Sequence, residues 1–192
     1  MRFRPDGVTW MMLAVALAAG LAWTEPGTAQ ESGGEKILIR ELPVAEQARL
    51  AEEAQVREQE AADLFGRARE AERAGDWGEA AKLYERSAEL RMDGDLRIAA
   101  AYALAGQAYF FDESLGRASR AWEEAGNRSL MVGDVIGAAR NFTYAAVTAE
   151  ETGSEMRALE LGWKAYHLTR SEALTPGERT MIRRHLQVTT GS

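Results

Sequence analysis

Hydrophobic and polar residues follow a helical period over most of the chain, and glycine and acidic residues interrupt it at intervals. From residue 76 onward, apolar residues recur four positions apart, as in Ala80, Tyr84 and Ala88, which places them on one face of an α-helix. The interruptions are Gly75-Asp76, Gly94-Asp95, Gly133-Asp134 and Gly153-Ser154. Glycine tolerates the left-handed conformation that ends a helix, and Asp or Ser can cap the next one. The pattern predicts seven helices, over residues 45–74, 76–92, 95–111, 114–132, 134–152, 154–171 and 175–188.

The first 29 residues have the three parts of an export signal. Arg2 and Arg4 are positively charged, residues 8–23 form an apolar run, and small residues end at Ala29, where we expect cleavage. A helix of these 16 apolar residues would be roughly 24 Å long, shorter than the roughly 30 Å hydrocarbon core of a bilayer. Cleavage predicts a periplasmic or secreted protein; the alternative is an uncleaved inner-membrane anchor with the domain facing the periplasm.

The next segments differ in their patterning. Residues 30–44 combine glycines, an isolated apolar Ile37-Leu38-Ile39 and a proline without a helical period, which is typical of a linker. Residues 45–60 are rich in helix formers and poor in large apolar residues, so we expect a leading helix segment that is largely solvated. The remaining residues, 61–188, form the predicted repeat domain.

Composition narrows the fold class and the partners. Strong helix formers dominate, and β-branched residues are sparse, which favours an all-α fold. The net charge of −7 provides no basic stripe for phosphates, so we expect no nucleic acid partner. The chain has no cysteine, which excludes disulfides, Cys-ligated zinc and lipidation through cysteine. Arginine outnumbers lysine 20 to 3, which, with the export signal, indicates a bacterial protein.

A shorter pattern repeats within the predicted helices. Every second helix carries a small residue, an aromatic one turn later and a small residue beyond it, as in Ala80, Tyr84, Ser87 and again in Ala118, Trp122, Ala125; Ala158, Gly162, Ala165 follow more weakly. One of the preceding helices places a small pair between two large residues, Tyr102, Ala105, Gly106 and Tyr109. The same spacing recurs as Leu64, Arg67, Ala68, Ala71 and as Phe142, Ala145, Ala146, Ala149. Small residues let two helix backbones approach, and a ring from the neighbour fills the space.

This pattern resembles the tetratricopeptide repeat, over about residues 61–188. The resemblance implies a right-handed solenoid of about three helical hairpins, beginning near Ala61, Ala99 and Ala139, with the last helix as a C-terminal cap. The steps of 38 and 40 residues exceed the usual 34 and are similar to the longer repeats of kinesin light chains. Two departures, Arg67 and Gly162, stand where large residues are usual. The residues expected to pack between helices are Ala80, Tyr84, Tyr102, Gly106, Tyr109, Ala118, Trp122, Ala125, Phe142 and Ala158.

The resemblance also implies where a partner would bind. In this family the first helix of each hairpin lines a concave groove, whose positions here are occupied by Phe65, Arg69, Leu104, Gln107, Arg140 and Tyr144, with Phe110 and Phe111 nearby. Some members hold a peptide carboxylate in a clamp of polar residues, and only Arg140 fits that clamp. We therefore expect a partner protein or peptide that offers an apolar or mixed helix or an extended segment.

Other chemistry is poorly represented. Trp77, Trp122 and Trp163 are expected to pack inside the fold rather than form an aromatic cage. His167 and His185 lack neighbours at metal-ligand spacing, and no catalytic or cofactor-binding motif occurs. The sequence therefore predicts a non-enzymatic scaffold or adaptor of the bacterial envelope without metal or cofactor. The alternative is a structural element that self-associates through residues 45–74 and the open ends of the solenoid, possibly anchored in the membrane.

Overall fold

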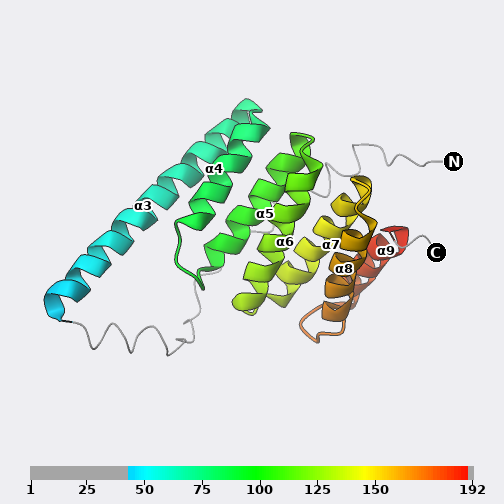
Figure 1. Ribbon diagram of the computed structural model, residues 1–192. Coiled ribbons are helices and arrows are strands. Elements are labelled where there is room, and N and C mark those ends of the chain that lie inside the picture. The colour runs from blue at the N-terminus through cyan, green and yellow to red at the C-terminus, as the bar shows by residue number, and fades with distance from the viewer. Residues whose placement is uncertain (1–42, 190–192) are drawn as a thin grey trace. The chain divides into compact units, whose positions relative to one another are not determined.

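The computed structural model describes residues 43–189, which form seven α-helices and no strand (Figure 1). The predicted signal and residues 30–42 of the predicted linker lie outside this range. The observed helices end within three residues of the predicted ends. They are α3 (Val44–Ala74), α4 (Trp77–Glu89), α5 (Leu96–Phe111), α6 (Leu115–Met131), α7 (Val135–Glu151), α8 (Glu155–Leu168) and α9 (Pro176–Thr189).

The helices end where the sequence places glycine and begin at capping side chains. Gly75, Gly94, Gly133 and Gly153 have φ between 75° and 88°, the left-handed region that only glycine enters without cost. Asp76, Asp95 and Asp134 each accept a hydrogen bond from a backbone N–H in the first turn of the next helix. Before α9, Thr175 and Glu178 cap each other's backbone N–H groups, which is the capping box.

The chain divides into two compact units at Ala51 and Glu52, inside α3. The first contributes only the start of α3 to the described residues. In the second, α4 packs on α5, α5 on α6, α6 on α7 and α7 on α8, while α9 lies against α7 and α8 (Figure 1). Two hydrogen bonds join α3 to α4: the Tyr84 hydroxyl donates to Glu72 at 2.6 Å and Ser87 Oγ to the Ala61 carbonyl at 2.7 Å. Each helix thus packs on its neighbours in sequence, as in a helical repeat.

The core is built mainly from alanine, so backbones lie close and a few large rings fill the remaining space. A Cβ atom added to Gly106 would lie 2.7 Å from the Trp122 ring, and one added to Gly126 would lie 2.8 Å from Phe142. Neither glycine can therefore gain a side chain without displacing a ring. Of the ten residues expected to pack between helices, all but Tyr102 are buried: Ala80, Tyr84, Gly106, Tyr109, Ala118, Trp122, Ala125, Phe142 and Ala158. Tyr102 is half-buried against Ala88, Ile98 and Ala101.

Candidate partner-binding groove

The eight candidate groove residues lie on α3, α5 and α7, which the sequence pattern assigns as the first helices of the predicted hairpins. Arg69 is exposed and forms an ion pair with Glu72 at 3.7 Å. The other seven, Phe65, Leu104, Gln107, Phe110, Phe111, Arg140 and Tyr144, are half-buried. They therefore divide their surface between packing inside the fold and contact with solvent.

Five rings form a continuous row across four helices, which we call the aromatic row. Trp77 of α4 contacts Phe111 of α5, with ring centroids 4.7 Å apart, and Phe111 contacts Phe110 at 6.1 Å. Phe110 contacts Trp122 of α6 at 5.9 Å, and Trp122 contacts Tyr144 of α7 at 5.4 Å. Rings at these separations attract one another beyond the area they bury. Trp122 thus joins the candidate groove residues of α5 to Tyr144 of α7.

Electrostatic contacts place Arg140 between Tyr144 and the start of α9. Burial raises the pKa of Tyr144 to about 12, and the positive charge of Arg140 opposes that rise. The hydrogen bonds from Thr175 lower the pKa of Glu178 in α9, and Arg140 lowers it further. The positive charge of Arg140 therefore acts on a phenol of α7 and on a carboxylate of α9.

Phe65 and Arg69 belong to a separate set of contacts at the α3–α4 hairpin. The ring of Phe65 meets that of Tyr84 edge-on, with centroids 5.1 Å apart. It packs both against the main core, which includes Tyr84, and against the smaller cluster of Ala88, Ile98 and Ala101. Burial raises the pKa of Tyr84, and the hydrogen bond to Glu72 raises it further. Arg69 pairs with the same Glu72 within α3, and the hydrogen bond from Tyr84 to Glu72 joins α3 to α4. The ring contacts thus join Phe110, Phe111 and Tyr144 through Trp122, whereas the contacts of Phe65 and Arg69 lie at the α3–α4 hairpin, outside the aromatic row.

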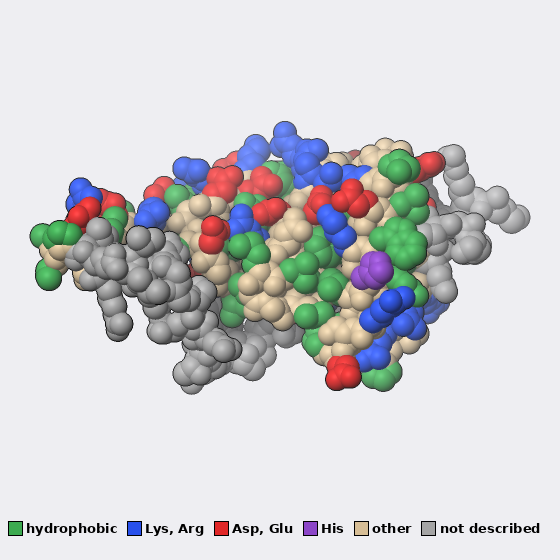
Figure 2. All heavy atoms as spheres, turned by 60° about the horizontal axis from the view of Figure 1, so that its bottom comes forward, with side chains coloured by type: hydrophobic (Ala, Val, Ile, Leu, Met, Phe, Trp, Pro, Cys, Tyr) green, Lys and Arg blue, Asp and Glu red, His purple; other side chains and the backbone are tan. Residues whose placement is uncertain are grey.

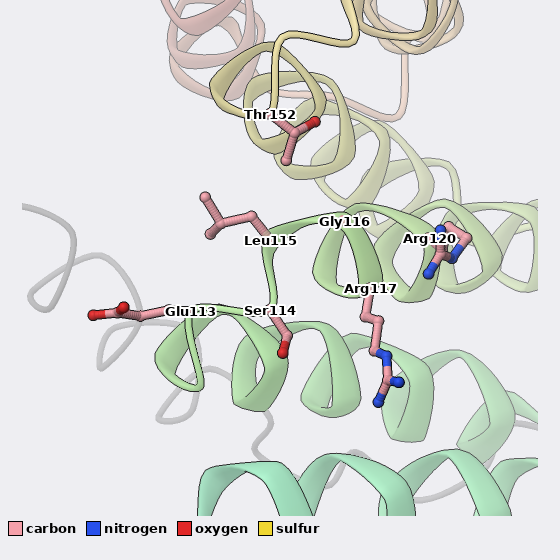
Figure 3. Close-up of a pocket in the computed structure, with 7 residues that line it drawn as sticks. All are labelled: Glu113, Ser114, Leu115, Gly116, Arg117, Arg120 and Thr152. Atoms are coloured by element: carbon pink, nitrogen blue, oxygen red, sulfur yellow. The ribbon is translucent and has the colours of Figure 1, made fainter.

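A shallow hollow of about 430 Å³ lies at the turn between α5 and α6 (Figure 3). Its lining consists of Glu113, Ser114, Leu115, Gly116, Arg117, Arg120 and Thr152. None of these residues is buried, and the guanidinium of Arg117 lies over the Tyr109 ring at 5.7 Å. In Figure 3, Glu113 points away from the hollow. An open hollow with solvated charges has no desolvated group to fix a ligand.

The prediction that Trp163 packs inside the fold is wrong. Its side chain is 59% exposed on α8, in one row with Met156 and Leu159, which are 79% and 43% exposed. Its ring contacts only those of Tyr166 at 5.8 Å and His167 at 5.7 Å among the described rings. Figure 2 shows hydrophobic side chains gathered beside a histidine on this face. The sequence did hold the signal, because Trp163 stands one position after the register position of Trp122.

Within residues 43–189, no three His, Asp or Glu side chains are arranged to hold a metal ion. In the same range, no helix is both long and apolar enough to cross a membrane. No protein-family model matches the chain, and no curated protein or solved structure was found to match it. The geometry of the residues therefore carries the functional argument.

Proposed function

We propose that this chain is a non-enzymatic adaptor that holds a partner protein or peptide on the face formed by α3, α5 and α7. Its fold would be a right-handed, tetratricopeptide-like solenoid of about three hairpins: α3 with α4, α5 with α6, and α7 with α8, capped by α9. The observation that carries the proposal is the aromatic row. Phe110 and Tyr144 contact Trp122, Phe111 contacts Phe110 and Trp77, and the three candidate groove rings remain half-buried.

The chemistry of this face favours an apolar or amphipathic segment. Leu104, Gln107 and Phe111 recur three and four positions apart on α5, so they share one side of that helix. Half-buried rings fixed by their neighbours lose little conformational freedom on binding, which favours affinity. Gln107 and Arg140 would supply the polar contacts at the edges. Helix-in-groove recognition uses this combination of apolar anchors and polar rim.

The proposed location rests on the export signal predicted at residues 1–29. A periplasmic or secreted adaptor would meet partners of the cell envelope. The runner-up is an element that self-associates through α3, for which the long leading helix is the supporting feature. A protein partner on α5 and α7 distinguishes the adaptor from this alternative.

Crosslinking of the tagged full chain in its own host, followed by mass spectrometry, tests the proposal. We expect one dominant foreign protein crosslinked to α5 and α7. The double variant Gln107→Arg and Arg140→Glu should abolish these crosslinks while keeping the helical circular dichroism, because it removes no ring of the aromatic row. Arg120→Glu, an exposed position on α6, is the matched control and should keep them. Crosslinks that survive the double variant, or that join only copies through α3, would contradict the adaptor.

A further inference from the structure

Residues of α6 and α8 that stand 40 positions apart in the sequence occupy equivalent places in the two helices, but one such pair of residues has different surroundings in the two helices. Ala118 and Ala125 of α6 stand 40 residues before Ala158 and Ala165 of α8, and all four are buried. The same offset matches Glu123 with Trp163.

Glu123 faces the second helix of the following hairpin. Its carboxylate accepts hydrogen bonds from Arg157 and, at 3.1 Å, from Lys164, both on α8. Figure 2 shows acidic and basic side chains close together on this face of the molecule. In α6, this register position therefore forms part of a helix–helix interface.

No helix among the described residues covers the corresponding position in α8. Met156, Leu159 and Trp163 recur three and four positions apart, so they form one exposed stripe, which we call the α8 edge. The capping helix α9 lies on a different side of α8, where Leu186 approaches Gly162. The position that continues the α6–α8 interface is thus apolar and open. Since Trp163 stands where α6 has the carboxylate of Glu123, ion pairs like those with Arg157 and Lys164 cannot form there, whereas another apolar face would cover the exposed side chains.

Charge along α8 is asymmetric and favours an antiparallel partner of the same kind. Glu150, Glu151 and Glu155 gather at its N-terminal end, where burial and the charges of Glu151 and Glu155 raise the pKa of Glu150. His167, Arg170 and Glu172 lie at the other end, with Arg170 over the Tyr166 ring at 6.0 Å. A two-fold axis that pairs two copies of this helix antiparallel keeps the two acidic ends apart and brings each of them beside the end that carries Arg170.

We propose that the α8 edge is the interface of a homodimer, in which α8 of two copies pair antiparallel through Met156, Leu159 and Trp163. About a centre between Leu159 and Trp163, each tryptophan lies on the leucine of the other copy. One helix pair would bury less than the roughly 1,200 Å² at the lower end of stable interfaces, so we expect weak dimerisation, with a dissociation constant in the micromolar range or above. The interface uses neither α5 nor α7 and does not depend on the adaptor proposal.

Sedimentation velocity of the full chain from about 1 to about 100 µM measures the dimer. Trp163→Glu introduces at this position the residue type that α6 carries at position 123, and it should raise the dissociation constant of the dimer at least tenfold. Leu96→Glu introduces the same charge at a position that is 61% exposed on α5, and it should leave the dimer unchanged. Should Trp163→Glu lose helical circular dichroism, Met156→Glu gives the same test at a more exposed site. A chain that stays monomeric, or a dimer that neither glutamate variant on α8 weakens, overturns the proposal.

A charge swap tests the antiparallel direction. Glu155→Arg alone and Arg170→Glu alone should each weaken the dimer, because each brings like charges together across the two-fold axis. The two changes combined should restore it. Weakening that persists in the combined variant overturns the antiparallel arrangement. The Gln107→Arg, Arg140→Glu variant should dimerise normally, which separates failure of this inference from failure of the groove.

Discussion

The second helices of the middle and last hairpins, α6 and α8, each carry a tryptophan, and the two side chains have opposite environments. Trp122 is 9% exposed, lies over Gly106 and contacts Phe110 and Tyr144. Trp163 is 59% exposed and stands one register position later. One position turns a side chain by about 100° around the helix axis. Register, and not residue type, therefore decides which tryptophan belongs to the core.

The last hairpin closes its end differently because Gly162 stands where α6 has Trp122. With no ring at this position, Leu186 of α9 approaches the glycine closely, because its side chain lies 3.3 Å from where a Cβ would be, slightly tighter than an ordinary contact. The capping helix thus occupies space that a large side chain fills in the middle hairpin. Because α9 packs on this side of α8, it does not cover the α8 edge, whose apolar side chains stay exposed.

Replacing each tryptophan by alanine gives the largest expected contrast. Trp122→Ala should lower the free energy of unfolding by about 3–5 kcal/mol, because it leaves a cavity between α5, α6 and α7. Trp163→Ala should change it by less than about 0.5 kcal/mol, since the side chain is mainly solvated. Urea unfolding followed by circular dichroism, at a concentration where the chain is monomeric, measures both. Equal costs for the two variants would show that the register is misassigned.

Adding a methyl group at three glycines sharpens the comparison on a smaller scale. Gly106→Ala should destabilise the domain by about 1–3 kcal/mol, because the new Cβ would lie 2.7 Å from Trp122. Gly66→Ala, with nothing within 4 Å, should stabilise α3 by up to about 1 kcal/mol, because alanine favours helix. Gly162→Ala should fall between them. Thermal unfolding of the three variants tests the order, and a stabilising Gly106→Ala would mean that Trp122 can move aside.

The smallest expected effect is a change in alkaline stability. The pKa of Tyr109 in the middle hairpin is raised to about 12 by burial and by its hydrogen bond to Glu85, and burial raises that of Tyr144 in the last hairpin to about 12. Folding therefore favours the protonated phenols, so stability from this source is complete below pH 10 and is lost as the pH rises from about 10 to about 12.

Tyr109→Phe and Tyr144→Phe should each reduce that loss. Urea unfolding at a series of pH values from neutral to alkaline measures the change, with each variant compared with its own stability at neutral pH. A loss as steep in both variants as in the unchanged chain would assign alkaline unfolding to other groups.

The sequence predicted the helices because the residues at their ends determine, by their own backbone preferences and capping side chains, where each helix starts and stops. Glycine at left-handed positions and Asp at helix starts need no knowledge of the rest of the fold. The turn before α6 shows the limit, since Glu113 takes φ 58° there without a glycine. Arg91 shows another: its side chain is only 4% exposed and donates to the carbonyl and hydroxyl oxygens of Ser87. Local pattern places an arginine on a polar face and does not reveal that α3 covers it.

The sequence predicted which helices carry the candidate groove residues, but it did not predict which side chains those residues contact. The period placed Phe110, Phe111 and Tyr144 on first helices, and the resemblance assigned them to a binding face. Their half-burial depends on Trp77 and Trp122, which reach them from second helices. Trp163 was misplaced for a related reason: a periodic pattern identifies the faces of a helix but not which face a neighbour covers.

The packing of each helix on its neighbours in sequence has a consequence for how the chain folds. Native contacts that join adjacent helices give a low contact order, and helical domains of this kind fold on the order of milliseconds or faster. A chain that is synthesised from its N-terminus can then assemble helix by helix as it emerges, from α3 toward α9. Folding would need no segment that has yet to arrive, except at the C-terminal end, where α7 and α8 wait for α9.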